Sequence, residues 1–600
     1  MKILRNIAYS ALIPALFALA ACSDDAVKAP DGSGTQTSGS SDDVQLALHF
    51  SFPAKTRGTT TGDGGSSDGN QGALSGEEKM SNFALTLLYP DNSGAYVPIP
   101  DCSFAGTFEG SYVKIAVSPK TVWQYMAGKT IRVRMTVNGG YAAGSTDYTS
   151  DIAKTAFDKI LDCKDIEDAT NGYSLPMANE YEFPVDMTAL TGATESAFNS
   201  LLESLLDRDR TLDLSEDARI SGTNTEAGTL SLERGVARID YKPKNWTKTQ
   251  DPTTNPLDAQ VFKVGEIPNL YAKMYSIQLL NVSREGFTFR HVSEGDQTHG
   301  ERTGGAEIVL GKENSNPYYD DDTDYSGNEP ADYNNYNWIK DTDWDNKNTW
   351  NSTANWTGPV NNTDGSTYFL NQPTKLTGEP IYTVHPTRVA GADTYYGLLN
   401  VYDHASFFNS DYKTRAISDD NYLPLWYVAE NTLPSTESMK NGMSTGLAFR
   451  MVLCKEDGTP LTPSDFDENY APNPENPTNV KVKGKLEDFN STYPGYYKLT
   501  IGSQERYAEI VSLPGHDTGY AITYYYFFKH NISNPHTLGT VEPMQYAVVR
   551  NNIYKVCVTA LNGLPDPYDP GKPDEPSENF IAVETAVLSW ARVSNPDIDL

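Results

Sequence analysis

Apolar and polar residues alternate in several short stretches of this 600-residue chain, which is the pattern of half-buried β-strands. The clearest stretch lies near the N-terminus, where Val44, Leu46, Leu48, Phe50 and Phe52 alternate with smaller or polar residues. Further strands are expected over Ala84–Tyr89, Tyr112–Val117, Thr130–Val137, Tyr275–Val282, Phe287–His291, Tyr520–Phe528, Tyr546–Val549, Ile553–Thr559 and Asn579–Val593. The pattern therefore predicts an all-β protein.

Two positions interrupt the alternation. Five apolar residues between Phe198 and Leu206 follow the helical period, and Thr194 stands where an N-cap belongs, so we expect one helix covering a face or an end of a sheet. In the strand Thr229–Tyr241 the alternating phase changes at Gly235, as at a β-bulge or at a bend between two domains. We therefore predict a domain boundary near residues 225–245.

The strand Val44–Phe52 is flanked by flexible sequence on both sides. Residues 23–42 are rich in Ser, Gly and Asp, and residues 58–80 are rich in Gly, Ser and Thr. Arg57 and Gly58 lie just past the end of the strand and form a trypsin-like cleavage site. A strand between two tethers, beside a cleavable bond, can be removed from a fold. Its removal would expose an apolar groove that another strand can fill.

The first residues have the pattern of a secretory signal. Lys2 and Arg5 give a positive start, and Ile7–Ala20 is apolar but too short to span a bilayer comfortably. Leu19-Ala-Ala-Cys22 matches a bacterial lipoprotein cleavage box, which predicts a lipid on the thiol of Cys22 and attachment to the outer membrane. The alternative is an ordinary secreted protein with a chance cysteine. No later segment approaches the ~20 apolar residues of a transmembrane helix.

Composition narrows the class of partner. A net charge of −32 and a pI near 4.6 argue against nucleic-acid binding, which needs a basic face. The abundance of Tyr, Thr, Asn, Asp and Gly favours strands and turns over helices. Besides Cys22 there are four cysteines, at positions 102, 163, 454 and 557, which are compatible either with two disulfides or with four buried thiols.

Motifs for enzymatic chemistry are absent from the sequence. There is no HExxH, no phosphate-binding Walker loop and no GxGxxG after a strand, so we expect neither an enzyme nor a cofactor. Residues 313–366 are dense in Asn, Asp, Tyr and Trp. Within them Asp322, Asp324 and Ser326 match the first half of a calcium loop, but Tyr333 stands where its bidentate Glu belongs. We therefore expect a solvated acidic loop and no metal.

The C-terminal end combines a spacer and a strand. Pro565–Ser577 is rich in proline and is expected to be a semi-rigid spacer. In the strand that follows, Ile581, Val583, Thr585 and Val587 form one face. Such a strand can reach away from its own domain, or it can complete its own sheet.

Several of these segments resemble the fimbrillins, the shaft subunits of type V pili. The resemblance rests on Tyr524–His530, on Met544–Tyr554 with its run VVRNNIY, on the spacer ending at Trp590, and on the mid-chain strand Leu232–Ile239. It looks closest to the major shaft subunit of the short fimbria. With the lipoprotein box and the strand before Arg57, it spans most of the chain, but not residues 313–366.

The resemblance implies two tandem transthyretin-like β-sandwich domains with minor helical insertions. It implies a signal peptide at 1–21, a propeptide at 22–57, an N-terminal domain at 58–240, and a C-terminal domain at 241–600 that carries the 313–366 insertion. An arginine-specific protease would cut the lipidated precursor after Arg57 and release the strand Val44–Phe52. A donor strand at about Phe580–Val593 of another subunit would then fill the groove. Lys55 leaves open a lysine-directed or looser cut.

The resemblance also implies partners and a location. The expected partners are identical subunits, accessory anchor and tip subunits, and host or bacterial surface ligands for adhesion and biofilm formation. The expected location is the outer membrane for the precursor and the extracellular fimbrium afterwards. Alternatives are an anchor subunit that keeps its first strand, a tip subunit without a usable donor strand, or a surface glycan-binding lipoprotein, which would not need Arg57.

Overall fold

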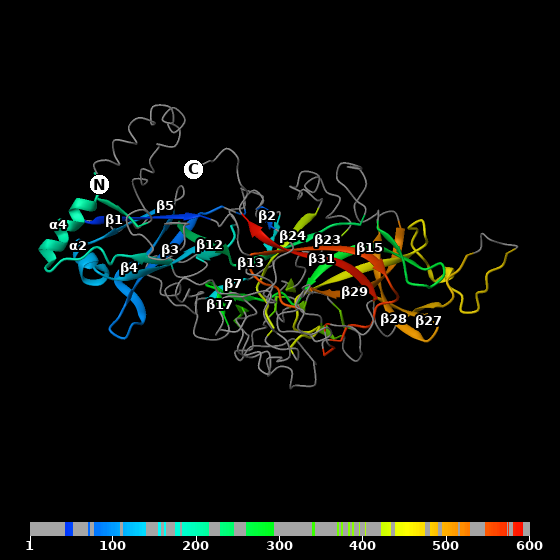
Figure 1. The fold of residues 1–600 in the computed structure, drawn as a ribbon. Coiled ribbons are helices and arrows are strands. Elements are labelled where there is room, and N and C mark those ends of the chain that lie inside the picture. Colours follow the sequence, from blue (N-terminus) through cyan, green and yellow to red (C-terminus); the bar gives the residue numbers. More distant parts are fainter. Residues whose placement is uncertain are drawn as a thin grey trace, which may run out of the picture.

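A computed structural model describes this protein as an elongated molecule, with α4 (Glu195–Leu205) near one end and β27 (Tyr496–Ile501) and β28 (Gln504–Leu513) near the other (Figure 1). The residues that it describes are 42–51, 70–72, 77, 79–107, 112–139, 154–157, 161–163, 174–179, 183–214, 229–244, 260–292, 339–342, 369–370, 374–375, 382–383, 387–388, 395–396, 402–403, 422–433, 438–474, 480–489, 495–513, 516–528, 546–569, 571–572, 574 and 580–591.

The N-terminal lobe is built on a nine-stranded sheet. Along its main path the order is β11 (Thr211–Asp213), β1 (Val44–Ser51), β12 (Thr229–Arg234), β9 (Met177–Asn179), β6 (Thr130–Val137), β3 (Asn82–Pro90) and β4 (Tyr96–Thr107), while β5 (Tyr112–Val117) pairs with β1 and β10 (Phe183–Asp186) pairs with β6. β12 joins two groups of strands, because its first half pairs with β1 and its second half with β9. Both groups contribute to one apolar core, so they close over each other as two layers.

The C-terminal lobe contains two larger sheets. The six-stranded sheet has the order β2 (Asn70–Gly72), β31 (Ile581–Ala591), β30 (Asn552–Leu561), β13 (Val236–Tyr241), β24 (Leu423–Ala429) and β8 (Leu161–Asp162). The eight-stranded sheet has the order β14 (Val261–Lys263), β15 (Tyr271–Leu280), β25 (Gly446–Cys454), β29 (His516–Phe527), β28, β27 and β26 (Lys485–Asp488), with β23 (Tyr402–Asp403) paired to β15. Apolar side chains of both sheets share one core, which makes this lobe a β-sandwich.

Short elements complete the fold. Two-stranded pairs join β7 (Lys154–Ala156) to β16 (Glu285–Phe287), β17 (His291–Val292) to β18 (Ile339–Lys340), β19 (Thr374–Lys375) to β20 (Tyr382–Thr383), and β21 (Thr387–Arg388) to β22 (Tyr395–Tyr396). The helices are α2 (Pro119–Thr121), the π-helix η3 (Val122–Met126), α4 and the 3-10 helix η6 (Pro463–Asp465). Within the described residues, none of these has the length and apolar composition that a bilayer span requires.

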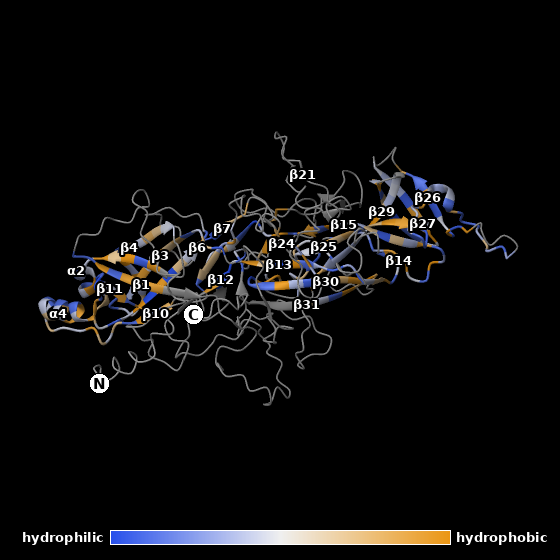
Figure 2. Cartoon of the chain, turned by 90° about the horizontal axis from the view of Figure 1, so that it is seen from above, coloured by the Kyte–Doolittle hydropathy of each residue, from blue (hydrophilic) through white to orange (hydrophobic). Residues whose placement is uncertain are grey.

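The all-β fold expected from the sequence is confirmed, and Figure 2 shows apolar residues recurring along its strands. The expected helix is α4; the hydroxyl of Thr194 accepts a hydrogen bond from the amide of Ala197, and Phe198 and Leu202 are buried. Two expected strands are wrong. Phe287–His291 is not a strand, because β16 ends at Phe287 and β17 begins at His291. The other is Tyr546–Val549. Residues 546–551 form turns with a single bridge from Val548 to Asn431, and the chain reverses at Asn551, whose φ is 56°.

The chain passes from one lobe to the other at Gly235. β12 ends in the N-terminal lobe at Arg234, and β13 begins at Val236 in the six-stranded sheet of the other lobe. Short segments also cross between the lobes, since β7 and β8, which precede Gly235, pair with β16 and β24, which follow it. The two lobes therefore meet along a joint made of several chain segments.

Candidate assembly site

The strand expected to be removable, β1, lies inside the sheet of the N-terminal lobe. Along one edge it pairs antiparallel with β5, from Val44 opposite Val117 to His49 opposite Tyr112. Along the other edge it pairs in parallel with β11 through residues 45–47 and with β12 through residues 49–51. Removing β1 would therefore leave a slot with unpaired backbone groups on both sides.

Side chains of β1 also fill the core of this lobe. Val44 and Leu46 are 0% exposed and Leu48 is 1% exposed, and all three belong to the core cluster shared by the two layers. These are three of the residues that the alternation assigned to the buried face. Phe50 belongs to β1 through its backbone pairing with Leu230, and Phe52 lies outside the described residues.

Arg210 holds the start of β1 in place. Its guanidinium donates to the carbonyl oxygens of Asp42 and Asp43, at 2.9 and 3.2 Å, and forms an ion pair of 2.8 Å with Glu203. Its carbonyl accepts a hydrogen bond from the amide of Gln45. The hydrogen bond with Glu203 raises the pKa of Arg210 above its ordinary value. The strand is thus secured at its first residues by the chain that leads into β11.

The expected donor strand, β31, lies in the C-terminal lobe of its own chain. It pairs antiparallel with β30 over nearly its full length, from Asn552 opposite Ser589 to Leu561 opposite Ile581, and in parallel with the short β2 near its end. Ile581 and Val583 pack against the core of the lobe, and the hydroxyl of Thr585 meets that of Tyr526. Val587 is the register partner of Tyr554. The strand completes its own sheet in this structure.

β31 is less buried than its neighbour. Residues 581–586 are half-buried except for Glu584, which is exposed, whereas residues 552–558 of β30 are buried throughout. A strand that contributes little buried side-chain area is held mainly by its backbone hydrogen bonds, so it can be transferred at lower cost than a central strand.

The spacer before β31 is docked onto its lobe instead of standing free. Tyr568 is 5% exposed, and its hydroxyl donates to the carbonyl of Asn441 at 2.6 Å. The amide of Asn441 donates to the carbonyl of Lys572 at 3.0 Å, and the amide of Asp574 donates to the carbonyl of Met439 at 3.2 Å. The hydroxyl of Ser444 donates to the carboxylate of Asp574, which is 4% exposed. Tyr568, Lys572 and Asp574 thus lie along the loop 438–445.

Docking of the spacer is expected to weaken as the pH rises. Burial raises the pKa of the Asp574 carboxyl well above its ordinary value, and the hydrogen bond from Ser444 offsets only part of this effect. The docked form therefore binds the Asp574 proton more tightly than the undocked form. This stabilises docking fully when the pH is below the ordinary pKa of an aspartate, and the stabilisation is lost as the pH rises toward the raised pKa of docked Asp574. Hydrogen exchange at the amides of Asn441 and Asp574 should become faster with rising pH, after correction for intrinsic rates. Asp574→Asn should abolish this dependence, and a dependence unchanged by that variant would contradict the prediction.

A cluster of buried charges joins the two lobes around Arg550. The Arg550 guanidinium is 0% exposed and donates to Glu430 at 2.8 and 3.0 Å, and it lies 3.8 Å from Glu233 of β12. It also donates to the carbonyls of Phe287 and Thr288. Burial opposes the charge, but Glu430 and Glu233 together raise the pKa of Arg550 above its ordinary value. Arg550 is therefore a charged link between the lobes.

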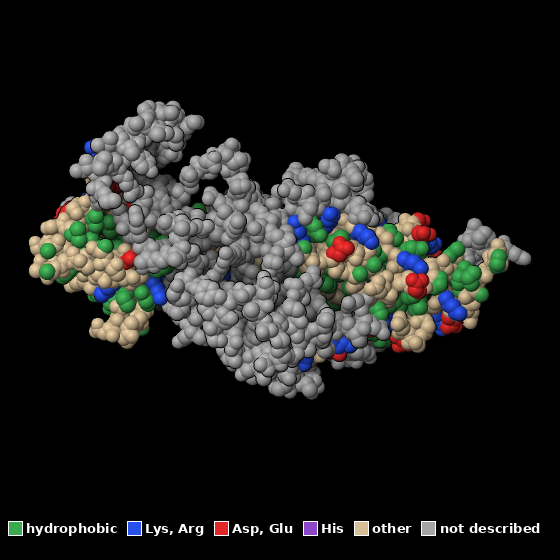
Figure 3. Space-filling view, in the orientation of Figure 1, with side chains coloured by type: hydrophobic (Ala, Val, Ile, Leu, Met, Phe, Trp, Pro, Cys, Tyr) green, Lys and Arg blue, Asp and Glu red, His purple; other side chains and the backbone are tan. Residues whose placement is uncertain are grey.

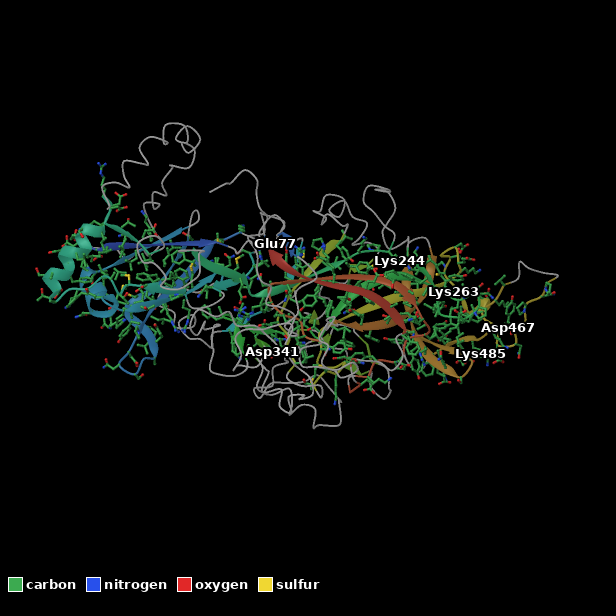
Figure 4. All side chains as sticks on the ribbon, viewed as in Figure 1. Glu77, Lys244, Lys263, Asp341, Asp467 and Lys485 are labelled. Carbon is green, nitrogen blue, oxygen red and sulfur yellow. The ribbon has the colours of Figure 1, made fainter. Side chains whose placement is uncertain are left out.

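A second buried cluster fastens the chain that follows the first strand. Arg238 donates to both carboxylate oxygens of Glu77, at 2.9 and 3.0 Å, and to both oxygens of Asp240. Tyr427 donates to Glu77 at 2.6 Å. Arg238, Glu77 and Asp240 are all 0% exposed. Figure 4 shows Glu77 near the middle of the long axis, where the lobes meet.

Some expected site residues lie outside the described residues. These are the lipidated Cys22, the cleavage site Arg57 and Gly58, and the calcium candidates Asp322, Asp324 and Ser326. Of the insertion 313–366, only residues 339–342 are described. Of the two alternatives for the cysteines, the structure shows buried thiols: Cys102, Cys163, Cys454 and Cys557 are buried and form no disulfide with one another. Burial raises the pKa of Cys102 and Cys454 to about 12 and that of Cys557 to about 11.

The residues that hold β1, the segment after it and the spacer carry no signal in the local sequence. Arg210, Glu77 and Asp574 were not singled out, since nothing in their local pattern differs from that of an exposed charge. One signal was available: the run VVRNNIY places Arg550 among apolar and amide residues, which is typical of a buried, paired arginine. On the described surface seen in Figure 3, acidic and basic side chains are interspersed over the C-terminal lobe, without a large patch of one sign.

Comparisons with known proteins give a family match at the C-terminal end and similar solved structures. Residues 519–595 match the family model described as the major fimbrial subunit protein type IV, fimbrillin, C-terminal. No curated protein matches the chain. Among solved structures, a fimbrilin from Porphyromonas gingivalis is 13% identical, with a TM-score of 0.35, and covers 92% of this chain and 99% of its own. A tip fimbrial protein from the same organism, truncated at its C-terminus, is 12% identical, with a TM-score of 0.26, and covers 91% and 100%. Both scores are too low to carry an argument about function.

Proposed function

We propose that this chain, a fimbrial subunit of the structural, non-enzymatic fimbrillin family, builds the shaft of a surface fimbrium by exchanging strands. The family resemblance seen in the sequence is confirmed, and fimbrial proteins are extracellular surface appendages. In the proposed sequence of events, a precursor anchored to the outer membrane through Cys22 is cut after Arg57 and loses β1. The β31 strand of another copy then occupies the slot, and the filament mediates adhesion.

The geometry of β1 is the observation that carries this proposal. A central strand whose apolar residues fill the core, but which is followed by a Gly-, Ser- and Thr-rich segment that begins at Arg57, is an unusual arrangement. β31 is long enough to replace it, with 11 residues against 8 in β1. Its inward face, Ile581, Val583 and Thr585, has the same spacing as Val44, Leu46 and Leu48.

Strand exchange would also supply the binding free energy that holds one subunit of a filament to the next. An incoming strand restores backbone hydrogen bonds on both sides of the slot and buries alternate apolar side chains. Each large apolar side chain that becomes fully buried contributes about 1.5–3 kcal/mol. Both ends of the exchange are occupied in the uncut chain, since β1 fills the slot and β31 completes its own sheet. The precursor can therefore remain monomeric during transport.

Replacing Arg57 by Ala is expected to stop assembly. Without the basic side chain an arginine-specific protease has no bond to cut, so β1 stays in its slot and no other strand can enter. The measurement combines N-terminal sequencing of the surface protein with a size ladder on denaturing gels. Wild-type protein should begin at Gly58 and form ladders, whereas Arg57→Ala should retain its propeptide and stay monomeric.

The matched control is Lys55→Ala, two positions before the proposed cut. It removes a positive charge from the same segment and should leave both the new N-terminus and the ladder unchanged. Ladders formed by Arg57→Ala would remove the proposed mechanism. If wild-type surface protein keeps a blocked, lipidated Cys22, it is an anchor subunit or a glycan-binding lipoprotein instead of a shaft subunit.

A further inference from the structure

The contacts of the spacer define which part of the C-terminal segment can move. The loop 438–445, on which the spacer lies, is itself held by hydrogen bonds from two buried asparagines. The side-chain amide of Asn281 donates to the carbonyls of Asn441 and Ser444, at 2.7 and 2.8 Å, and that of Asn431 donates to the carbonyl of Met443 at 2.8 Å. Both asparagines are 0% exposed. The spacer is therefore docked on a rigid platform.

Apolar contacts add to this docking. Tyr568 belongs to a small core with Leu433, Met439, Met443, Phe527 and Tyr546. Its ring centroid lies 4.8 Å from that of Tyr525 in β29. Among the described residues of the spacer, the contact farthest along the chain is that of Asp574 with Ser444 and with the backbone of Met439. Undocking the spacer would expose the Tyr568 ring and leave the polar groups of the loop without their partners, whereas releasing β31 alone would disturb neither.

Resting on the strand exchange proposed above, we infer that the exchanging arm begins after Asp574. The spacer up to Asp574 stays docked on its own lobe in the filament, and only the chain beyond it passes to the neighbouring copy. Asp574 and Ser444 form the root of this arm. The root lies near the end of the proline-rich segment that the sequence predicts to be a semi-rigid spacer.

This root limits where the next subunit can lie. From Asp574 to Ile581 an extended chain spans at most about 25 Å, because each residue adds ~3.3–3.6 Å. The slot left by β1 in a second copy of this chain must therefore open within that distance of Asp574. Consecutive subunits are thus in contact, with the N-terminal lobe of one copy against the face of the C-terminal lobe that carries loop 438–445.

Two disulfide locks test the position of the root. Ser444→Cys combined with Asp574→Cys ties the spacer to its platform. Glu584→Cys ties β31 to β30 instead, because its register partner is the native Cys557. Each precursor is oxidised, its crosslink verified by mass, and then cut with an arginine-specific protease. Polymer growth is followed as a size ladder, with and without reductant.

The chain locked at 444 and 574 is expected to polymerise within twofold of wild type, whether or not it is reduced. The Glu584→Cys chain should stay at background until reductant is added. If the lock at 444 and 574 stops growth and reduction restores it, the arm begins earlier and the inference is overturned. Polymers grown by the locked Glu584→Cys chain would instead show that β31 is not the donor, which overturns the proposed function.

A measurement on wild-type protein covers the case in which the double cysteine variant does not fold. The amides of Asn441 and Asp574 should exchange with solvent equally slowly in the precursor and in the filament. A tenfold or larger acceleration at both amides in the filament would mean that the spacer undocks, and would overturn the inference independently of any variant.

Discussion

A chain that starts at Gly58 is expected to lose about 5–9 kcal/mol from the free energy of unfolding of its N-terminal lobe, since each large apolar side chain taken out of a core removes about 1.5–3 kcal/mol. The three side chains concerned are those of Val44, Leu46 and Leu48, which are almost completely buried in the uncut protein. Natural domains are stable by only about 5–15 kcal/mol, so an empty slot brings the lobe close to unfolding. Urea titration with a probe in this lobe would measure the loss.

A peptide covering residues 580–593 should restore much of this stability when it is added to the shortened chain. The peptide offers the inward face of β31 to the slot and supplies a backbone that can pair with β5 on one side and with β11 and β12 on the other. The same peptide with Val583→Asp is the matched control, because burying an unpaired carboxylate in the slot is strongly unfavourable. Equal rescue by both peptides, or a shortened chain as stable as the precursor, would contradict the role assigned to β1 and β31.

Replacing Arg550 by Met is expected to lower the free energy of unfolding of the precursor by about 3–5 kcal/mol, because it removes the counter-charge from the buried carboxylate of Glu430. Glu430 is 1% exposed and Glu233 is 2% exposed, so water cannot replace the guanidinium there. Glu233 and Glu430 belong to segments of different lobes, and Arg550 also donates to the chain beside β16. We therefore expect the variant to separate one cooperative transition into two, seen by probes placed in each lobe.

The matched control is Lys485→Met at an exposed ion pair of the C-terminal lobe. Lys485 lies 3.1 Å from Glu468, and its side chain is 42% exposed, so water solvates both charges when the pair is removed. This variant should unfold like the wild type. An Arg550→Met chain with unchanged midpoint and a single transition would mean that the cluster does not couple the lobes.

Much of the fold follows from local pattern in the sequence. Val44–Phe52 alternates because one face of a strand meets a core, and this relation holds wherever the strand lies, so β1 and its buried face could be predicted without knowing its neighbours. The same is true of α4, since an N-cap such as Thr194 acts within its own first turn. The face of β31 was also predictable, with Ile581, Val583 and Thr585 directed at a core.

Contacts between distant segments could not be predicted in this way. Residues 546–549 are an apolar run such as a buried strand would have, yet the chain turns there, and Arg550 next to the run reaches Glu430 and Glu233 across the joint. Glu77 looks like a solvated charge in a flexible segment, but it is fully buried against Arg238 and Tyr427. Nothing near these residues in the sequence distinguishes a buried charge from an exposed one, because the partner that stabilises it comes from another part of the chain.

The sequence by itself determined that the chain is all-β, that its first strand precedes a cleavable arginine and that its last strand has an apolar face. Only the tertiary structure decided where these strands lie: β1 between β5 and the pair β11 and β12, and β31 beside β30 with its spacer bound through Asp574. The physical reason is that strand periodicity is a property of neighbouring residues. Which edge a strand pairs with, and which loop holds a spacer, depend on packing between segments hundreds of residues apart.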